Sequence, residues 1–397
     1  MKLFKSLLVA PATLGLFAPV AVNATEVNFN AISNYSQEEI EIDSNSFSNY
    51  STANPLLAGG EGMVDSHDHD SDSFSSTTTA SFSADFAIGA VDGKGITSTV
   101  TDGDEALQAG YGFQIDLTTS FTGEDSLDIS IDAGNINGST TSGTQSPLAE
   151  FDLNGPGDGL SVDGVMYTFP LGSATAFVGD NTDGSALFTT ACVYGGPSNT
   201  LDDCGNVNAG ITGAGTAFGA SMDFDNGFTA AIGYAGDGST AQKGLMTLEG
   251  LDAYGLNAAY TADTYGVSLT YATVETSTTA EDTWTAINGY WAPEGFPSVS
   301  AGYEVGDIGG AAATADEKTS FFLGVQFDEV GPGSLGFAMG TKTPTVENVD
   351  EQYMYEVFYS YDVNDGMTIT PLVYVKENST VGTPDETGVI VKTSFSF

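Results

Sequence analysis

Arginine is absent from this 397-residue chain, and basic residues of any kind are scarce. Eight lysines stand against 53 acidic residues, which gives a formal net charge of −45 at pH 7. So much negative charge repels phosphate backbones and anionic lipid headgroups. The composition therefore argues against a protein that binds nucleic acid.

The chain also lacks a long unbroken apolar run. Its most apolar stretch, Leu7–Val22, is interrupted by Pro11 and Pro19, whereas a transmembrane helix needs about 20 consecutive apolar residues. Two lysines precede this stretch and small residues follow it, which is typical of an export signal. We therefore expect residues 1–24 to be a signal peptide and the protein to leave the cytoplasm.

Histidine and cysteine occur only twice each. His67 and His69 lie in an acidic tract of residues 25–73, a polar segment without sustained periodicity. We expect this segment to be flexible, and weak binding of a divalent ion by its histidines is the alternative. Cys192 and Cys204 lie in a glycine-rich segment and are predicted to form a disulfide in an exported protein. No catalytic motif or phosphate-binding loop accompanies them, so we expect neither an enzyme nor a cofactor.

What the chain does contain, from Phe74 onward, is alternation of apolar and polar residues. Ala80, Phe82, Ala84, Phe86 and Ile88 alternate with serines and an aspartate, and residues 109–117 and 127–131 repeat the pattern. Since successive side chains of a strand point to opposite faces, these segments are predicted to be amphipathic strands.

Turn signals separate the predicted strands. Asp225-Asn226-Gly227 joins residues 218–224 to 228–234, and Asn364-Asp365-Gly366 joins two segments near the end of the chain. Further strands are predicted at 254–260 and 265–271, and weaker candidates lie at 160–170, 174–180, 282–292, 297–306, 319–328 and 334–342. With about sixteen strands, residues 74–397 are predicted to form an all-β, transmembrane antiparallel β-barrel.

The polar face of the predicted strands is strongly acidic. Carboxylates are costly in a dry core and cheap beside a water-filled lumen. We therefore predict a pore lined by Asp85, Asp116, Asp128, Asp132, Asp223, Glu304, Glu356 and the rare cation Lys392. A soluble antiparallel sheet with one face in water would also accommodate these residues.

The segment 180–215 is longer than a hairpin loop normally is, and such long loops are usually functional. The sequence is compatible with two conformations of this segment. It folds into the barrel and narrows the pore, or it is a surface loop held together by its disulfide.

Four segments resemble cyanobacterial outer-membrane porins, namely Tyr111–Gly123 (YGFQIDLTTSFTG), Val162–Gly172 (VDGVMYTFPLG), Phe224–Phe228 (FDNGF) and Gly388–Phe397 (GVIVKTSFSF). Those porins are related to the carbohydrate-selective (OprB-type) porins and are sometimes labelled iron-uptake porins. The resemblance covers roughly residues 75–397. It implies a passive, trimeric channel in the outer membrane of a Gram-negative bacterium, and it supports Phe397 as a barrel-assembly signal.

The chain departs from that family in two ways. Many members carry an N-terminal domain and a coiled coil that bind peptidoglycan, and residues 25–73 are too short for both, which puts peptidoglycan anchoring in doubt. Many porins also set arginines against acidic residues at the constriction, and this chain has none.

The sequence therefore favours an outer-membrane porin that passes small hydrophilic solutes such as sugars and inorganic ions, with a preference for cations. A secreted or surface-attached acidic β-protein with a structural or adhesive role is the alternative. A barrel enzyme is a third possibility, and it would require a pair of catalytic carboxylates.

Overall fold

The computed structural model describes residues 77–92, 107–135, 147–151, 153, 157–211, 215–238, 243–247, 249–311, 315–378 and 384–397. The predicted signal peptide and the predicted flexible segment 25–73, with His67 and His69, lie outside these residues. Among the residues described, no helix is long and apolar enough to cross a membrane.

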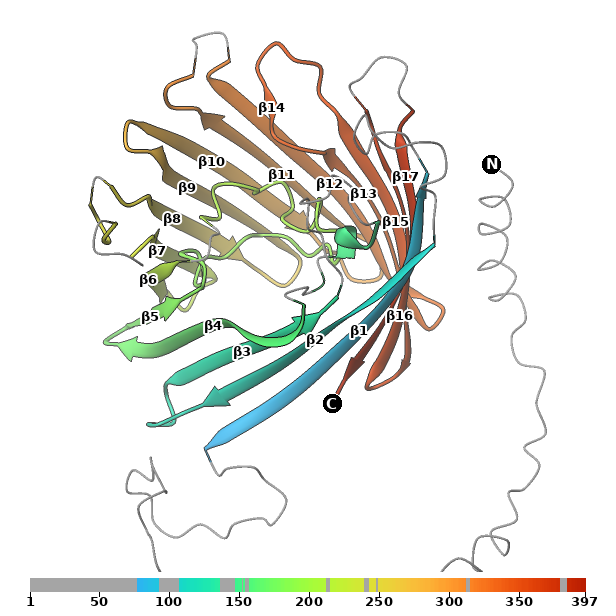
Figure 1. Ribbon diagram of the computed structural model, residues 1–397, viewed down its shortest axis with the longest axis horizontal. Helices are drawn as coiled ribbons and strands as arrows, with labels where there is room; N and C mark the ends of the chain where they lie inside the picture. The colour runs from blue at the N-terminus through green and yellow to red at the C-terminus, as the bar shows by residue number, and fades with distance from the viewer. Residues whose placement is uncertain are drawn as a thin grey trace, which may run out of the picture. The chain divides into compact units, whose positions relative to one another are not determined.

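Most of the described chain is in antiparallel strands (Figure 1). The strands are β1 (Thr78–Asp92), β2 (Gln108–Thr119), β3 (Ser126–Gly134), β4 (Gly157–Leu171), β5 (Ala174–Asp180), β6 (Thr216–Asp223), β7 (Phe228–Gly236), β8 (Asp252–Thr261), β9 (Tyr265–Ser277), β10 (Ala280–Trp291), β11 (Ser298–Asp307), β12 (Glu317–Val330), β13 (Gly333–Thr341), β14 (Thr345–Val346), β15 (Tyr353–Asn364), β16 (Met367–Lys376) and β17 (Glu386–Ser396). One short 3-10 helix, η5 (Pro147–Phe151), lies between β3 and β4.

The strands form a closed ring. Each long strand pairs with the next one along the chain, and β17 returns to pair with β1 over Ser83–Asp92. The two-residue strand β14 pairs only with β12, beside β13, so the barrel wall consists of sixteen long strands. The predicted all-β antiparallel barrel of about sixteen strands is confirmed.

The last residue takes part in this closure. The backbone N–H of Phe397 donates to the Phe82 carbonyl at 3.0 Å, and the Phe82 N–H donates to the Phe397 carbonyl at 2.9 Å. Their rings stack with centroids 5.7 Å apart. A closed ring leaves no unpaired strand edge at this seam, so its backbone groups are satisfied without water.

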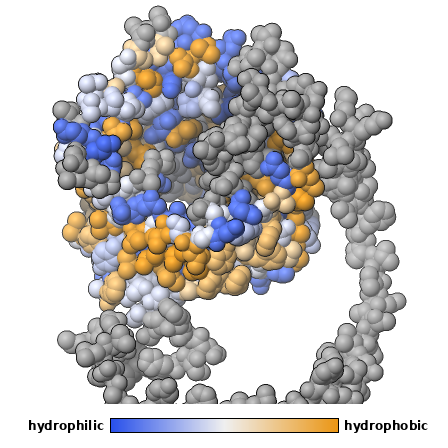
Figure 2. Space-filling model, viewed as in Figure 1, coloured by the Kyte–Doolittle hydropathy of each residue, from blue (hydrophilic) through white to orange (hydrophobic). Residues whose placement is uncertain are grey.

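The two faces of the wall differ in polarity. On β8 and β9, Leu256 and Leu269 are 55% and 52% exposed on the outer face. The inner face of the same strands carries polar residues such as Asn257, Ser268 and Thr270, which are buried inside the barrel. Figure 2 shows orange, hydrophobic residues across the lower part of the outer wall and blue residues around the hollow above it. This outside-apolar, inside-polar arrangement is the reverse of a soluble protein and suits a wall that faces hydrocarbon.

Candidate functional site: the barrel interior

The connection between β5 and β6 lies inside the ring of strands (Figure 1). We call its described residues 181–211 the inner loop. Every second backbone N–H from residue 189 to residue 195 donates to an inward-facing side chain. The pairs are Thr189 to Asn257 Oδ1 at 2.9 Å, Ala191 to Ser268 Oγ at 2.9 Å, Val193 to Ser300 Oγ at 3.0 Å and Gly195 to Gln326 Oε1 at 2.8 Å.

The acceptors lie on β8, β9, β11 and β12, so this part of the inner loop crosses the strands at the inner surface. Alternate N–H groups of an extended chain point to the same side, which explains why alternate residues reach the wall. Of the two structures that the sequence left open, the inner loop therefore adopts the one folded into the barrel.

The returning part of the inner loop is held mainly by Glu304 on β11. Glu304 Oε1 accepts the backbone N–H groups of Asn208 at 2.8 Å and Ala209 at 2.7 Å, and Oε2 accepts the Asn208 side-chain amide at 2.8 Å. Nearby, Asn288 Nδ2 donates to the Cys204 carbonyl at 2.8 Å. These contacts satisfy backbone groups that would otherwise be buried without partners.

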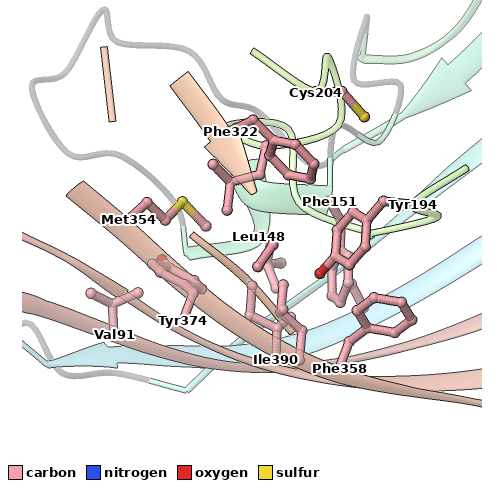
Figure 3. Packing of buried hydrophobic residues seen from close by; sticks show 14 residues of the cluster. Val91, Leu148, Phe151, Tyr194, Cys204, Phe322, Met354, Phe358, Tyr374 and Ile390 are labelled. Atoms are coloured by element: carbon pink, nitrogen blue, oxygen red, sulfur yellow. The ribbon is translucent and has the colours of Figure 1, made fainter. Parts of the chain in front are cut away.

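Cys192 and Cys204 form a disulfide between the outgoing and returning parts of the inner loop. Tyr194 and Cys204 pack against Phe322, Phe358 and other inward-facing residues of the wall in one buried hydrophobic cluster (Figure 3). The inner loop is thus held by polar bonds, a covalent bond and apolar packing, and it occupies part of the lumen as a fixed element.

The helix η5 is a second inward element. Its residues Leu148 and Phe151 belong to the same buried cluster. Its Glu150 forms an ion pair with Lys376 of β16 and accepts a hydrogen bond from Thr200 Oγ1 of the inner loop at 3.0 Å. The ion pair therefore ties η5 to the wall, and the threonine ties η5 to the inner loop.

All eight residues predicted to line the pore have their side chains on the inner face of the wall, as the strand register shows. Five of them are at least partly exposed there, namely Asp85, Asp116, Asp128, Asp223 and Lys392.

The other three are buried, which corrects the prediction that they face open water. Glu304 is 0% and Glu356 5% exposed because the inner loop covers them, and Asp132 on β3 is 3% exposed. Glu356 Oε1 accepts a hydrogen bond from Tyr194 of the inner loop at 2.7 Å. Burial and the adjacent Glu356 carboxylate raise the pKa of the Tyr194 hydroxyl, which keeps it a hydrogen-bond donor. Glu304 and Glu356 thus anchor the inner loop.

The partly exposed carboxylates on β1–β3 form the acidic part of the wall. Asp116 accepts hydrogen bonds from Ser130 Oγ at 2.7 Å and Gln114 Nε2 at 2.8 Å. Asp128 accepts them from Thr118 Oγ1 and Ser126 Oγ, both at 2.8 Å. Asp116 and Asp128 lie on β2 and β3, whereas the wall side chains that bond the backbone of the inner loop lie on β8–β12. Both carboxylates are partly exposed, so they keep contact with the lumen.

Sequence reasoning missed the residues that receive the inner loop. Asn257, Ser268, Ser300 and Gln326 are ordinary inward-facing polar residues of amphipathic strands, and only their register distinguishes them. Among the described residues, no group of three or more His, Cys, Asp or Glu side chains has the arrangement of a metal site.

Closed sixteen-stranded barrels with an apolar outer face and a long loop folded inside are the architecture of porins. The chain matches no known family model and no curated protein sequence. The chain is similar to solved structures, and this similarity shows its fold alone.

The structure is similar to that of Pseudomonas putida OprB, with a TM-score of 0.60 and 11% identity over 81% of this chain and 94% of that chain. It is also similar to two mutants of the Rh. blastica porin, each with a TM-score of 0.51 and covering 81% of this chain and all of that one, at 11% and 12% identity. The chain therefore has a porin-type fold.

Proposed function

We propose that this protein is an outer-membrane porin, a passive water-filled channel for small hydrophilic solutes. The observation that carries the proposal is the closed barrel with an apolar outer face, a polar inner face and an inner loop bonded inside the lumen. The porin fold of its structural neighbours supports it. A secreted structural or adhesive protein would have no need of so many exposed apolar side chains, such as Phe86, Leu256 and Ile287, on its wall.

The solutes we propose are inorganic cations and neutral sugars. Asp116 and Asp128 are fixed on the inner wall by hydroxyl and amide donors, and the chain has a net charge of −45 and no arginine. A lumen lined by carboxylates attracts cations and repels anions. Neutral sugars are indifferent to this charge, so their passage depends on the width that the inner loop and η5 leave open.

Three further parts of the proposal rest on the sequence. The lysines and the apolar run of residues 1–24 support export by a signal peptide. The family resemblance of residues 75–397 supports assembly into a homotrimer and insertion into a Gram-negative, cyanobacterial outer membrane with the help of Phe397.

Reversal potentials in a KCl gradient across a planar bilayer test the proposed channel and its selectivity. We expect conductance with cation preference, reduced in the double variant Asp116→Asn/Asp128→Asn. A matched control is Asp263→Asn/Glu294→Gln, which removes the same charge from exposed positions in the β8–β9 and β10–β11 turns, away from the acidic wall of β1–β3. Anion preference in the unaltered protein would contradict the selectivity, and absence of any conductance by the folded barrel would contradict the channel. Liposome swelling with sugars of graded size measures the width of the pore.

A further inference from the structure

The inner loop lines a cavity of its own. The cavity has a volume of about 350 Å³ and lies between the outgoing and returning parts of the loop, on either side of the Cys192–Cys204 disulfide. Phe188, Thr190 and Tyr194 line it from the outgoing part. Its volume lies within the range of small-molecule sites, at the lower end.

The returning part of the inner loop gives the cavity its negative charge. Asp202 and Asp203 line the cavity and are exposed, so the cavity is open to water at these carboxylates. Of the described residues that line it, none is basic. Two adjacent carboxylates favour a cationic occupant and disfavour an anionic one.

A buried amide adds an unused acceptor. Asn206 lines the cavity, is only 7% exposed and donates its Nδ2 to Thr190 Oγ1 at 3.4 Å. Its Oδ1 is buried and accepts no hydrogen bond within the described part of the chain. A buried acceptor left unsatisfied costs about 1–3 kcal/mol, so a ligand that donates a hydrogen bond here gains an advantage.

The remaining lining favours an organic ligand over a metal ion. The rings of Phe188 and Tyr194 and the disulfide give the cavity apolar surface, and aromatic faces attract ammonium groups. The described residues contain no three-ligand group suited to a metal ion. An alkylammonium ion has N–H donors, a positive charge and an apolar body, which match the acceptors, the carboxylates and the rings.

We propose that this cavity of the inner loop binds small organic cations of the alkylammonium class. Organic cations are a solute class beyond the inorganic cations and sugars proposed above. The lumen could conduct solutes without this site on the inner loop.

Isothermal titration calorimetry of the folded, detergent-solubilised barrel with putrescine tests the proposal. Butane-1,4-diol serves as the uncharged probe of the same length. We expect putrescine to bind and the diol not to bind. In Asp202→Asn/Asp203→Asn the affinity for putrescine should fall by about tenfold or more, which corresponds to ~1.4 kcal/mol.

The matched control is Asp180→Asn/Asp183→Asn, which removes one carboxylate at the end of β5 and one at the start of the inner loop, neither of which lines the cavity. It should bind putrescine as the unaltered protein does. Equal loss of affinity in both double variants would show that overall acidity and not the cavity is responsible, and absence of binding, or equal binding of the diol, would also overturn the proposal. Binding in detergent does not depend on conduction, so its failure is distinguishable from failure of the proposed channel.

Discussion

Replacing Glu304 by alanine should release the returning part of the inner loop while leaving the barrel folded. The Glu304 carboxylate is 0% exposed and accepts three hydrogen bonds at 2.7–2.8 Å from Asn208 and Ala209. If the loop kept its place in the variant, three buried donors would lose their acceptor. At about 1–3 kcal/mol for each unsatisfied donor, the bound position of the loop would lose roughly 3–9 kcal/mol.

The donors recover most of that loss if residues 205–211 detach from β11 and bond to water, which frees the inner loop from its fixed position across the lumen. The wall strands are paired with one another independently of the loop, so β11 keeps its neighbours β10 and β12. We therefore expect single-channel conductance in a planar bilayer to rise in Glu304→Ala. Removing a carboxylate from an open acidic pore would by itself lower cation conductance, so a rise reports movement of the loop.

Two controls accompany this measurement. Glu304→Gln keeps an acceptor oxygen for the backbone N–H groups of Asn208 and Ala209 and should conduct nearly as the unaltered protein does. Heat-modifiable migration on a gel confirms that each variant is a folded barrel. A folded Glu304→Ala variant with unchanged or lower conductance would refute the inference that this carboxylate holds the loop.

Two further predictions concern the wall and a turn. A Cβ at Gly302 would clash with the Cys204 carbonyl oxygen, so Gly302→Val should push the inner loop from the wall and change single-channel conductance. Gly159→Val should leave the conductance unchanged, because a Cβ at Gly159 would meet nothing within 4 Å. Equal conductance of the two variants would argue against close packing of the loop on the wall. Partial burial opposes the charged form of Asp125, but hydrogen bonds from Thr122, Tyr167 and Ser120 outweigh it and hold the pKa of Asp125 below its ordinary value of 3.8. A lowered pKa contributes stability above pH 3.8 that is lost as pH falls further. Asp125→Asn should therefore lower the unfolding temperature at pH 7, with the difference shrinking below pH 3.8, and a difference independent of pH would contradict this account.

The strands could be predicted from the sequence because alternation is a local property. Residues 80–88 show which side chains share a face, and the same period recurs along the chain. The closing contact was also predictable, because Phe82 lies in the first strand and Phe397 directly follows the last one, and a barrel must join those two strands. The turn at Asp225-Asn226-Gly227 likewise lies between β6 and β7 as predicted.

The roles of Glu304 and Glu356 could not be predicted from the same pattern. Alternation shows that both face inward, but it does not show whether water or another segment covers them. Their partners, Asn208 and Tyr194, are 96 and 162 positions away along the chain. Contacts over such separations depend on the path of the inner loop, and no local period encodes that path.

The sequence by itself determined the strand class, the two faces of the wall and the acidity of the interior, because these follow from residue type and a period of two. Only the tertiary structure decided which inward residues meet the lumen and which hold the inner loop. Asp116 and Glu304 look alike in an amphipathic strand. They differ because the inner loop is bonded over Glu304 and not over Asp116. That difference comes from backbone donors of the inner loop, which must find acceptors once they leave water.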